Sequence, residues 1–374
     1  MIFKNCTFYN ELFEKELGDI RVENGKIQEI GFFKESGRDM SGRIILPGFV
    51  DIHIHGANGG DTGDNSVESL DKMSAFLAEN GVTSFCPTTM SRPVDELIIT
   101  AQSIADYKHS RHTKGAKIAG INYEGPFISK EKCGSQNSDY ITAGRSEDFN
   151  GLYDASGGLM KLITVAPEAF DSAFFIENAA SQCTVSIGHS AANSAQTKKA
   201  IENGASHITH LYNAMTPMTS REAGVVGAAL DSSVTCELIC DGEHVCPEVI
   251  RNTFKILGEN RAVVVSDSMR AAGLGEGEYE LGGQTVYVNK NGGVARLEDG
   301  TIAASITNLF EEFKNLIAFG IDFKTALKAC TINPARVIKE DGNIGSIAKG
   351  KCADFTVVDE NLNLLEVYIN GTLA

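Results

Sequence analysis

The sequence of 374 residues has no tryptophan. It also has no run of about 18 apolar residues that could form a membrane-spanning helix. Lys and Arg together number 33 against 49 Asp and Glu, which gives a formal net charge of -16. A surface so poor in positive charge is unsuited to binding nucleic acid or an anionic membrane. It does not exclude an anionic substrate, because a pocket can be locally positive.

The 9 cysteines include no Cys-x-x-Cys pair, and their number is odd. Cys86, Cys183 and Cys236 lie within apolar runs, where a free thiol behaves as a small hydrophobic side chain. The N-terminal residues show no basic start followed by an apolar stretch, so no signal peptide is expected. We therefore expect a reduced, cytoplasmic protein without a membrane span.

With 42% hydrophobic residues, the chain can bury a large core and hold two domains. From residue 49 to about 334, short apolar strands alternate with segments of helical periodicity, which is typical of a parallel (β/α)8 barrel of the TIM type. The expected strands are residues 49–55, 82–87, 117–123, 160–165, 183–188, 207–210, 235–240 and 262–267. The expected helices are residues 66–80, 93–107, 193–203, 247–257, 305–319 and 322–330.

The two ends of the chain have a different pattern. Short strands separated by turns are expected at residues 1–8, 19–23, 26–31 and 43–46, and strand-like sequence returns at 345–359. We expect residues 1–48 and 341–374 to form one small β-sandwich domain, and residues 49–340 to form the catalytic barrel. A β-hairpin insertion is expected near residues 279–297, around Asn291-Gly292-Gly293.

Polar residues follow the ends of several barrel strands. His53 and His55 alternate at the end of the first strand, so their side chains face the same way and can share a metal ion or one ion of a pair. Further candidate ligands end later strands: Glu124, His189, His210 and Asp267. A barrel enzyme collects a metal site from several strand ends, whereas any single residue of this kind could equally be a turn or cap residue.

Hydrolysis at such a site needs further groups. A metal ion with an open position lowers the pKa of bound water from about 15.7 to about 7, and a base must then pass a proton to the leaving group. Asp267 is the candidate base, with a helix cap as the alternative. Asn213 and Ala214 offer backbone N–H donors after the sixth strand. Arg221 has a planar fork suited to phosphate, although it could equally be a solvated surface residue.

Seven motifs are spread over nearly the whole chain. They are Leu46-Pro47-Gly48-Phe49-Val50-Asp51-Ile52-His53-Ile54-His55-Gly56, Glu124-Gly125-Pro126-Phe127-Ile128, Ile187-Gly188-His189-Ser190, Thr209-His210-Leu211-Tyr212-Asn213-Ala214-Met215, Arg221-Glu222-Ala223-Gly224-Val225-Val226-Gly227, Asp241-Gly242-Glu243-His244-Val245 and Ser266-Asp267-Ser268-Met269-Arg270-Ala271-Ala272-Gly273. Together they resemble the N-acetylglucosamine-6-phosphate deacetylases of the amidohydrolase superfamily.

The resemblance implies a cytoplasmic homodimer that hydrolyses the acetamide of N-acetylglucosamine 6-phosphate to acetate and glucosamine 6-phosphate, in amino-sugar catabolism and cell-wall recycling. It also implies that Glu124, His189 and His210 bind a divalent metal ion, zinc or iron. Members of the family differ at the first strand. Because this chain keeps His53 and His55, each subunit can hold one ion or two.

The resemblance further implies that Asp267 is the catalytic acid/base. The sugar-phosphate contacts that it implies are Asn213, Ala214, Arg221 and His244. Two positions differ from the family pattern. Gln136 stands where the family usually has a histidine that contacts the reacting amide, and Ala304 stands where it usually has glycine. The acyl group or the sugar of the substrate could therefore differ.

Three alternatives stay open at this point. One is a related N-acyl-hexosamine phosphate as substrate, such as N-acetylgalactosamine 6-phosphate. Another is a cyclic-amide hydrolase of the dihydroorotase type, which would need a lysine at the end of the fourth strand, whereas Lys161 lies at its start. The third is a catalytically impaired scaffold, which should have lost its metal ligands or its base, and this chain keeps both.

Overall fold

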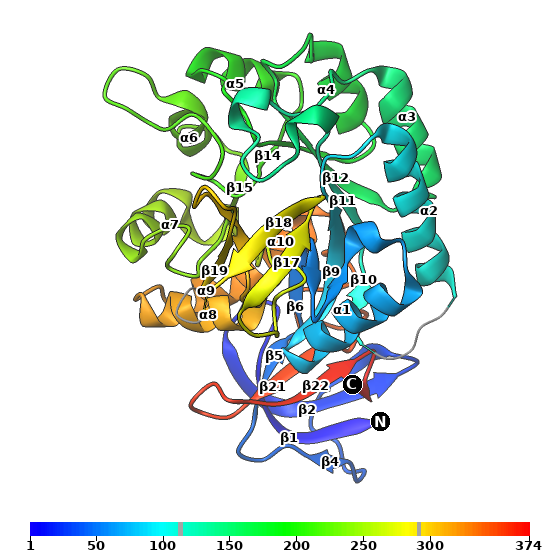
Figure 1. Ribbon diagram of the computed structural model, residues 1–374. Helices are drawn as coiled ribbons and strands as arrows, with labels where there is room; N and C mark the ends of the chain where they lie inside the picture. The colour runs from blue at the N-terminus through cyan, green and yellow to red at the C-terminus, as the bar shows by residue number, and fades with distance from the viewer. Residues whose placement is uncertain (111–114, 290–292) are drawn as a thin grey trace.

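A computed structural model describes residues 1–110, 115–289 and 293–374 (Figure 1). Its centre is a parallel barrel in which β6 pairs with β9, followed by β11, β12, β13, β14, β15 and β16 in that order. The strands are β6 Phe49–Ile54, β9 Val82–Thr89, β11 Ile121–Glu124, β12 Met160–Val165, β13 Thr184–Ile187, β14 His207–Ile208, β15 Thr235–Leu238 and β16 Ala262–Val264, with the short β10 Lys117–Ile118 beside β9. The predicted barrel is confirmed.

The barrel closes between its last strand and its first. The backbone N–H of Asp267 donates to the carbonyl of His53 at 2.9 Å. One residue earlier, the Ser266 hydroxyl donates to Asp51 at 2.6 Å. Every residue of β6 and β9 is buried, as expected for parallel strands that are covered on both faces.

The six predicted helices are all present. They are α1 Val67–Glu79, α2 Val94–His109, α5 Ser194–Glu202, α7 Pro247–Arg261, α8 Leu309–Ala318 and α9 Phe323–Cys330. Four further helices were not predicted: α3 Ser146–Ala155, α4 Ala173–Ala180, α6 Gly224–Leu230 and α10 Ile332–Val337. No described helix is long and apolar enough to cross a membrane.

One predicted helix begins later than the sequence pattern indicates. Helix α8 was expected to start at Ser305, but Ser305 is the last residue of a strand, and its backbone N–H donates to the Asp267 carbonyl. The helix instead starts after Asn308, whose side chain accepts hydrogen bonds from the backbone N–H groups of Phe310 and Glu311. An N-cap asparagine of this kind sets the first turn of a helix.

The N-terminal and C-terminal strands share one sheet, and both chain ends lie on it (Figure 1). Its order is β23-β22-β21-β5-β1-β2-β3, with β4 beside β1. The strands are β1 Ile2–Tyr9, β2 Lys15–Glu23, β3 Lys26–Gly31, β4 Arg38–Asp39, β5 Ile44–Pro47, β21 Phe355–Val358, β22 Leu364–Ile369 and β23 Thr372–Leu373. The boundaries of the predicted domains, 1–48 with 341–374 and 49–340, stay a prediction.

The prediction of strand structure at residues 345–359 is correct for only part of this range. Within it, Phe355–Val358 forms β21, whereas the residues before it run through turns. Gly345 and Gly350 adopt the left-handed backbone conformation, with φ of 86° and 89°, which an extended strand cannot accommodate. The sheet contacts the barrel through Lys117, whose ammonium group pairs with Asp354 at 2.6 Å.

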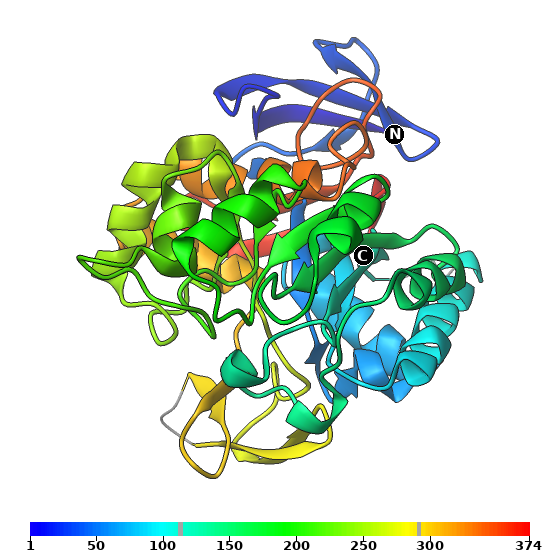
Figure 2. The same ribbon diagram turned by 90° about the horizontal axis from the view of Figure 1, so that it is seen from above.

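A second small sheet follows the barrel. It consists of β17 Gly277–Leu281, β18 Gln284–Val288, β19 Val294–Arg296 and β20 Ile302–Ser305 in antiparallel order. Figure 2 shows it projecting from the barrel on the side away from the N-terminal strands. The predicted hairpin near 279–297 belongs to this sheet, although Asn291 and Gly292 of its turn lie outside the described residues. Strand β20 brings the chain back to Asp267.

Candidate active site

The strand ends place the candidate residues at one end of the barrel. Glu124 is the last residue of β11, and His53 and His55 lie in and directly after β6. His189, His210 and Asp267 come just after β13, β14 and β16, and all have positive φ, of 46°, 25° and 46°. Such backbone conformations cost about 1–3 kcal/mol each in non-glycine residues and cluster at functional sites.

Glu124, His189 and His210 form the first group of potential metal ligands. Oε1 of Glu124 lies 2.8 Å from Nε2 of His210 and 3.1 Å from Nε2 of His189, and the two Nε2 atoms are 3.1 Å apart. Nδ1 of His189 donates to the carbonyl of Lys132 at 2.9 Å. This hydrogen bond leaves Nε2 of His189 with a free lone pair for a metal ion.

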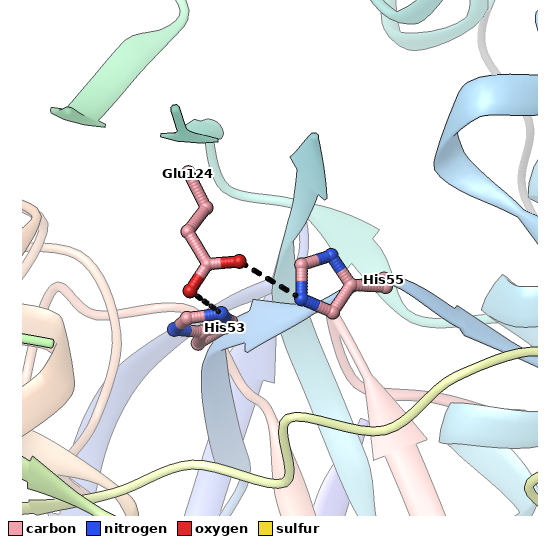
Figure 3. A group of neighbouring side chains, drawn as sticks. All are labelled: His53, His55 and Glu124. Atoms are coloured by element: carbon pink, nitrogen blue, oxygen red, sulfur yellow. Dashed lines mark ion pairs between the residues drawn. The ribbon is translucent and has the colours of Figure 1, made fainter. Parts of the chain in front are cut away.

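His53, His55 and the same Glu124 form the second group (Figure 3). Nε2 of His53 lies 3.5 Å from Oε1 of Glu124, and Nε2 of His55 lies 3.4 Å from Oε2. Nδ1 of His55 donates to the carbonyl of Thr88 at 3.2 Å, so its Nε2 also keeps a lone pair. Glu124 therefore joins the two groups, with one oxygen reaching toward both.

The residues present fit a divalent metal ion. Imidazole nitrogens and carboxylate oxygens are ligands for zinc and iron. Nε2 of His53 is buried and has no hydrogen-bond partner among the described residues. Burial lowers the pKa of His53, but the charges of Glu237, Glu124 and Asp267 outweigh it and raise the pKa to about 9. A field that favours a proton here also favours a metal cation.

Asp267 lies beside both groups. Its Oδ1 is 3.2 Å from Nε2 of His55 and 3.5 Å from Nε2 of His53. Burial raises the pKa of Asp267, but the His53 and His55 rings outweigh it and hold the pKa below its usual value. The carboxylate is therefore ionised at neutral pH and able to accept a proton.

These side chains open into a cavity of about 420 Å³, within the size range of small-molecule sites. The predicted site residues on its wall are His55, Glu124, His189, His210, Asn213, Ala214, His244 and Asp267. Residues that the sequence did not indicate also line it: Glu131, Lys132, Gly134, Ser135, Thr301, Ile302 and Ala303. A cavity of about 410 Å³ lined by α2, β10 and the C-terminal segment contains none of the predicted site residues.

His53 and three other predicted positions lie off this wall. The Gln136 side chain is buried, and its Nε2 donates to Oε2 of Glu124 at 2.6 Å. Arg221 is exposed in the loop between β14 and α6. Ala304 is fully buried and packs in a cluster with Met90 and Met269. The roles predicted for these residues stay predictions.

His244 is held by the segment after β15. Its Nδ1 forms a hydrogen bond of 2.6 Å with Oδ2 of Asp241, and its backbone N–H donates to Oδ1 of the same residue. The other ring nitrogen is therefore available to a ligand in the cavity, whose wall His244 joins.

One buried acidic residue was missed at the sequence level. Glu237 lies within β15, is fully buried and contacts His53. The signal that could have found it is a single acidic residue inside an otherwise apolar barrel strand, because a buried charge needs a partner.

A parallel barrel with a shared histidine–carboxylate centre at the ends of its strands defines the class of metal-dependent barrel hydrolases. The family model described as "Amidohydrolase family" matches residues 44–374, so the chain belongs to the amidohydrolase family.

Among its relatives is the N-acetylglucosamine-6-phosphate deacetylase of Bacillus subtilis (strain 168), which is 35% identical over 100% of this chain and 97% of that protein. The N-acetylgalactosamine-6-phosphate deacetylase of Escherichia coli O157:H7 is 31% identical over 95% of this chain and 94% of that protein. A crystal structure of N-acetylglucosamine-6-phosphate deacetylase from Pasteurella multocida aligns with a TM-score of 0.93 at 31% identity, covering 100% of this chain and 99% of that one. The resemblance drawn from the motifs is confirmed.

Proposed function

We propose that the protein hydrolyses the acetamide of N-acetylglucosamine 6-phosphate to acetate and glucosamine 6-phosphate. The observation that carries the proposal is one cavity that joins the Glu124 ligand centre, the ionised Asp267 and the ring of His244. A hydrolase for a sugar phosphate needs all three: a place for a metal ion, a group that moves a proton, and a donor for an anion.

The metal centre of the proposal comprises two sites. Glu124, His189 and His210 would hold one divalent ion, zinc or iron, and Glu124 with His53 and His55 would hold a second. When bound, such an ion polarises the amide carbonyl and lowers the pKa of a water molecule. The pairing of imidazole and carboxylate ligands supports zinc or iron over magnesium or calcium, which prefer oxygen ligands.

Asp267 would move the proton. Its ionised carboxylate accepts the proton of the attacking water and delivers it to the amine nitrogen as the C–N bond breaks. The hydrogen bond from its backbone N–H to the His53 carbonyl, at 2.9 Å, fixes its position relative to the ligand groups. The neighbouring His53 and His55 rings keep it ionised before the reaction, as the lowered pKa indicates.

The phosphate would be bound by the second half of the barrel. We assign it to the backbone N–H of Ala214, to His244, and to Arg221 from the adjacent loop. Asn213 would contribute through its side chain, because its backbone N–H donates to the His210 carbonyl at 3.0 Å. Asp241 orients the His244 ring toward the cavity through the hydrogen bond to its Nδ1. A guanidinium group and oriented N–H donors are suited to phosphate oxygens.

Two further parts of the proposal concern the setting of the enzyme. The cysteines are all free thiols, which supports a reducing, cytoplasmic environment. Assembly as a homodimer is carried over from the resemblance to the deacetylase family. Sedimentation analysis of the purified protein tests the dimer.

The second candidate substrate is N-acetylgalactosamine 6-phosphate, which the similarity to the E. coli O157:H7 relative supports. A cyclic-amide hydrolase is disfavoured by Lys161, whose ammonium group pairs with Glu340 at 2.7 Å. Lys161 follows Met160, the first residue of β12, and so lies at the end of the strand opposite to the ligand groups.

An acetate-release assay separates these substrates. The panel contains N-acetylglucosamine and N-acetylgalactosamine, each with and without a 6-phosphate, together with longer N-acyl derivatives. We expect the highest kcat/KM on N-acetylglucosamine 6-phosphate. Equal rates on the phosphorylated and free sugars would contradict the proposal, and a preference for the galacto isomer would favour the second candidate.

A further inference from the structure

Beneath the two ligand groups lies a carboxylate that the proposed reaction does not use. Glu237 is fully buried in β15 and has hydrogen-bond partners from two other barrel segments, β6 and the segment of β14 with the residues that follow it. Its Oε2 lies 2.9 Å from Nδ1 of His53 and 3.1 Å from the backbone N–H of His210. Its Oε1 lies 3.2 Å from Nε2 of His207.

These contacts assign the proton positions. An ionised carboxylate only accepts hydrogen bonds, so His53, His207 and the His210 backbone must all donate to it. In the neutral ring that binds a metal ion, Nδ1 of His53 therefore carries the proton, and Nε2 is the nitrogen that can bind the ion. That Nε2 is the buried atom without a partner, 3.5 Å from both Glu124 and Asp267.

Glu237 differs from the groups that hold His55 and His189, whereas Nδ1 of His210 has no hydrogen-bond partner among the described residues. Nδ1 of His55 donates to a backbone carbonyl of Thr88, and Nδ1 of His189 donates to that of Lys132. Only His53, among these rings, is held by a charged acceptor. A carboxylate behind a histidine increases the basicity of the opposite nitrogen and fixes the ring, which strengthens its bond to a metal ion.

We propose that Glu237 is a positioning residue that makes His53 a metal ligand and couples the His53–His55 site to the site of His189 and His210. It does so by holding the His53 ring with Oε2 and anchoring the backbone of His210 with the same oxygen. The inference rests on the metal centre of the proposed function but not on its substrate.

If Glu237 had only a structural role, that role would be to accept the hydrogen bond of a buried histidine. His207 is fully buried, its Nε2 donates to Glu237, and its Nδ1 forms a hydrogen bond of 2.6 Å with the Thr235 hydroxyl. In that case the loss of the Glu237 charge would lower the stability of the protein without a selective change in metal binding.

The test compares Glu237→Gln with the matched control Glu312→Gln. Both residues are fully buried carboxylates that accept a backbone hydrogen bond. Glu312 lies on the covering helix α8 and accepts from the backbone N–H of Cys240, which follows β15. Each variant is stripped of metal and titrated with Co²⁺ in a calorimeter, and bound metal is counted by elemental analysis. Thermal unfolding of the metal-free proteins reports stability separately.

We assign the lower-affinity step to the His53–His55 site, whose ring nitrogens lie 3.5 and 3.4 Å from Glu124, against 2.8 and 3.1 Å at the other site. We expect Glu237→Gln to weaken that step by about 10- to 100-fold, as for other partners of metal-binding histidines. The higher-affinity step should change far less, and Glu312→Gln should bind two ions like the wild type. A Glu237→Gln variant with both affinities within two-fold of wild type, or an equal loss in the control, would overturn the proposal. A wild-type protein that binds only one metal ion would also overturn the proposal.

A second measurement applies if Glu237→Gln does not fold. Nitrogen-15 NMR of the histidine rings in the zinc-loaded wild type distinguishes coordinated, protonated and bare nitrogens. We expect His53 to be coordinated through Nε2 and protonated at Nδ1, and coordination through Nδ1 would overturn the proposal. Failure of the acetate-release assay would contradict the proposed substrate and would leave both measurements on Glu237 unaffected.

Discussion

Glu124 and Gln136 are joined by a hydrogen bond of 2.6 Å, in which the side-chain amide of Gln136 donates to Oε2 of the carboxylate. The other end of the amide accepts from the backbone N–H of Ser91 at 2.6 Å. Gln136 thus connects the loop after β11 and the end of β9 to the residue shared by both ligand groups. An orienting role follows from these contacts, whereas contact with the reacting amide stays a prediction.

The first prediction concerns Gln136→Ala. It removes the donor to Glu124 and leaves the Ser91 N–H buried without an acceptor, which typically costs about 1–3 kcal/mol. We expect lower thermal stability and weaker metal retention, with KM for the sugar phosphate changed by less than about three-fold. Unfolding curves, elemental analysis and steady-state kinetics check this. A large rise in KM with intact metal would instead support contact with the substrate.

Gln136→His provides the complementary comparison, because histidine is the usual residue of the family at this position. If the side chain reaches the amide, a histidine donor stabilises the negative charge of the transition state and raises kcat more than it changes KM. If Gln136 acts through Glu124, the histidine variant should lose metal and kcat together.

The second prediction concerns Asp267→Asn. The amide cannot accept the proton of the attacking water, and general acid–base help is worth ~10²–10⁴-fold in rate. We expect turnover to fall by that amount while the metal content stays near that of the wild type, because Glu124 and the four histidines remain. A variant that keeps more than a tenth of wild-type turnover would show that another group moves the proton.

The third prediction distinguishes the two ligand groups. Glu124 belongs to both, whereas His53 belongs to one. Glu124→Gln should therefore lose most of the bound metal, and His53→Ala should lose about half of it. Elemental analysis of both purified variants, beside the wild type, gives the numbers. Equal losses in the two variants would mean that the sites are not arranged as two groups joined by Glu124.

Metal removal gives the fourth prediction. Without a cation, the buried imidazole and carboxylate groups around Glu124 have no common partner, whereas an ion that binds only the folded state stabilises it. At a concentration of about 1,000 times its dissociation constant, such an ion adds about 4 kcal/mol. We expect chelation to lower the thermal midpoint and readdition of zinc to restore it. An unchanged midpoint with metal demonstrably removed would argue against tightly bound ions.

Alternation and strand position were enough to predict much of this site. His53 and His55 alternate on β6, and Glu124, His189, His210 and Asp267 follow apolar runs, so a barrel brings them to one mouth. The same apolar runs predicted the fold, because eight apolar strand segments that alternate with helical segments can form few other architectures.

The sequence could not indicate partners that depend on tertiary contacts. The apolar strand around Glu237 indicates that the residue is buried, but its partners are defined only once the barrel closes around it. The bond between Gln136 and Glu124 depends on the path of an irregular loop. Helix α6, with the sequence Gly-Val-Val-Gly-Ala-Ala-Leu, was missed because its glycines disfavour a helix in isolation. Its burial against the barrel overrides that preference.

The last prediction concerns phosphate recognition by His244 and Arg221. His244 lies on the cavity wall and is oriented by Asp241, whereas Arg221 is exposed in a neighbouring loop. The phosphate is remote from the amide, so its contacts stabilise the ground state and the transition state alike, and their loss raises KM with little change in kcat.

We expect His244→Gln and Arg221→Ala each to raise KM for N-acetylglucosamine 6-phosphate by about ten-fold or more, since hydrogen bonds to charged groups contribute about 1.5–3 kcal/mol. The unphosphorylated sugar is the internal control, and its kcat/KM should change by less than about two-fold. Lys198→Ala is the control variant, because Lys198 pairs with Asp231 at 2.8 Å on the surface and lies off the cavity wall. If Arg221→Ala affects both sugars equally, its role is to hold the loop; if it affects neither, the phosphate is bound by His244 and the Ala214 backbone without it.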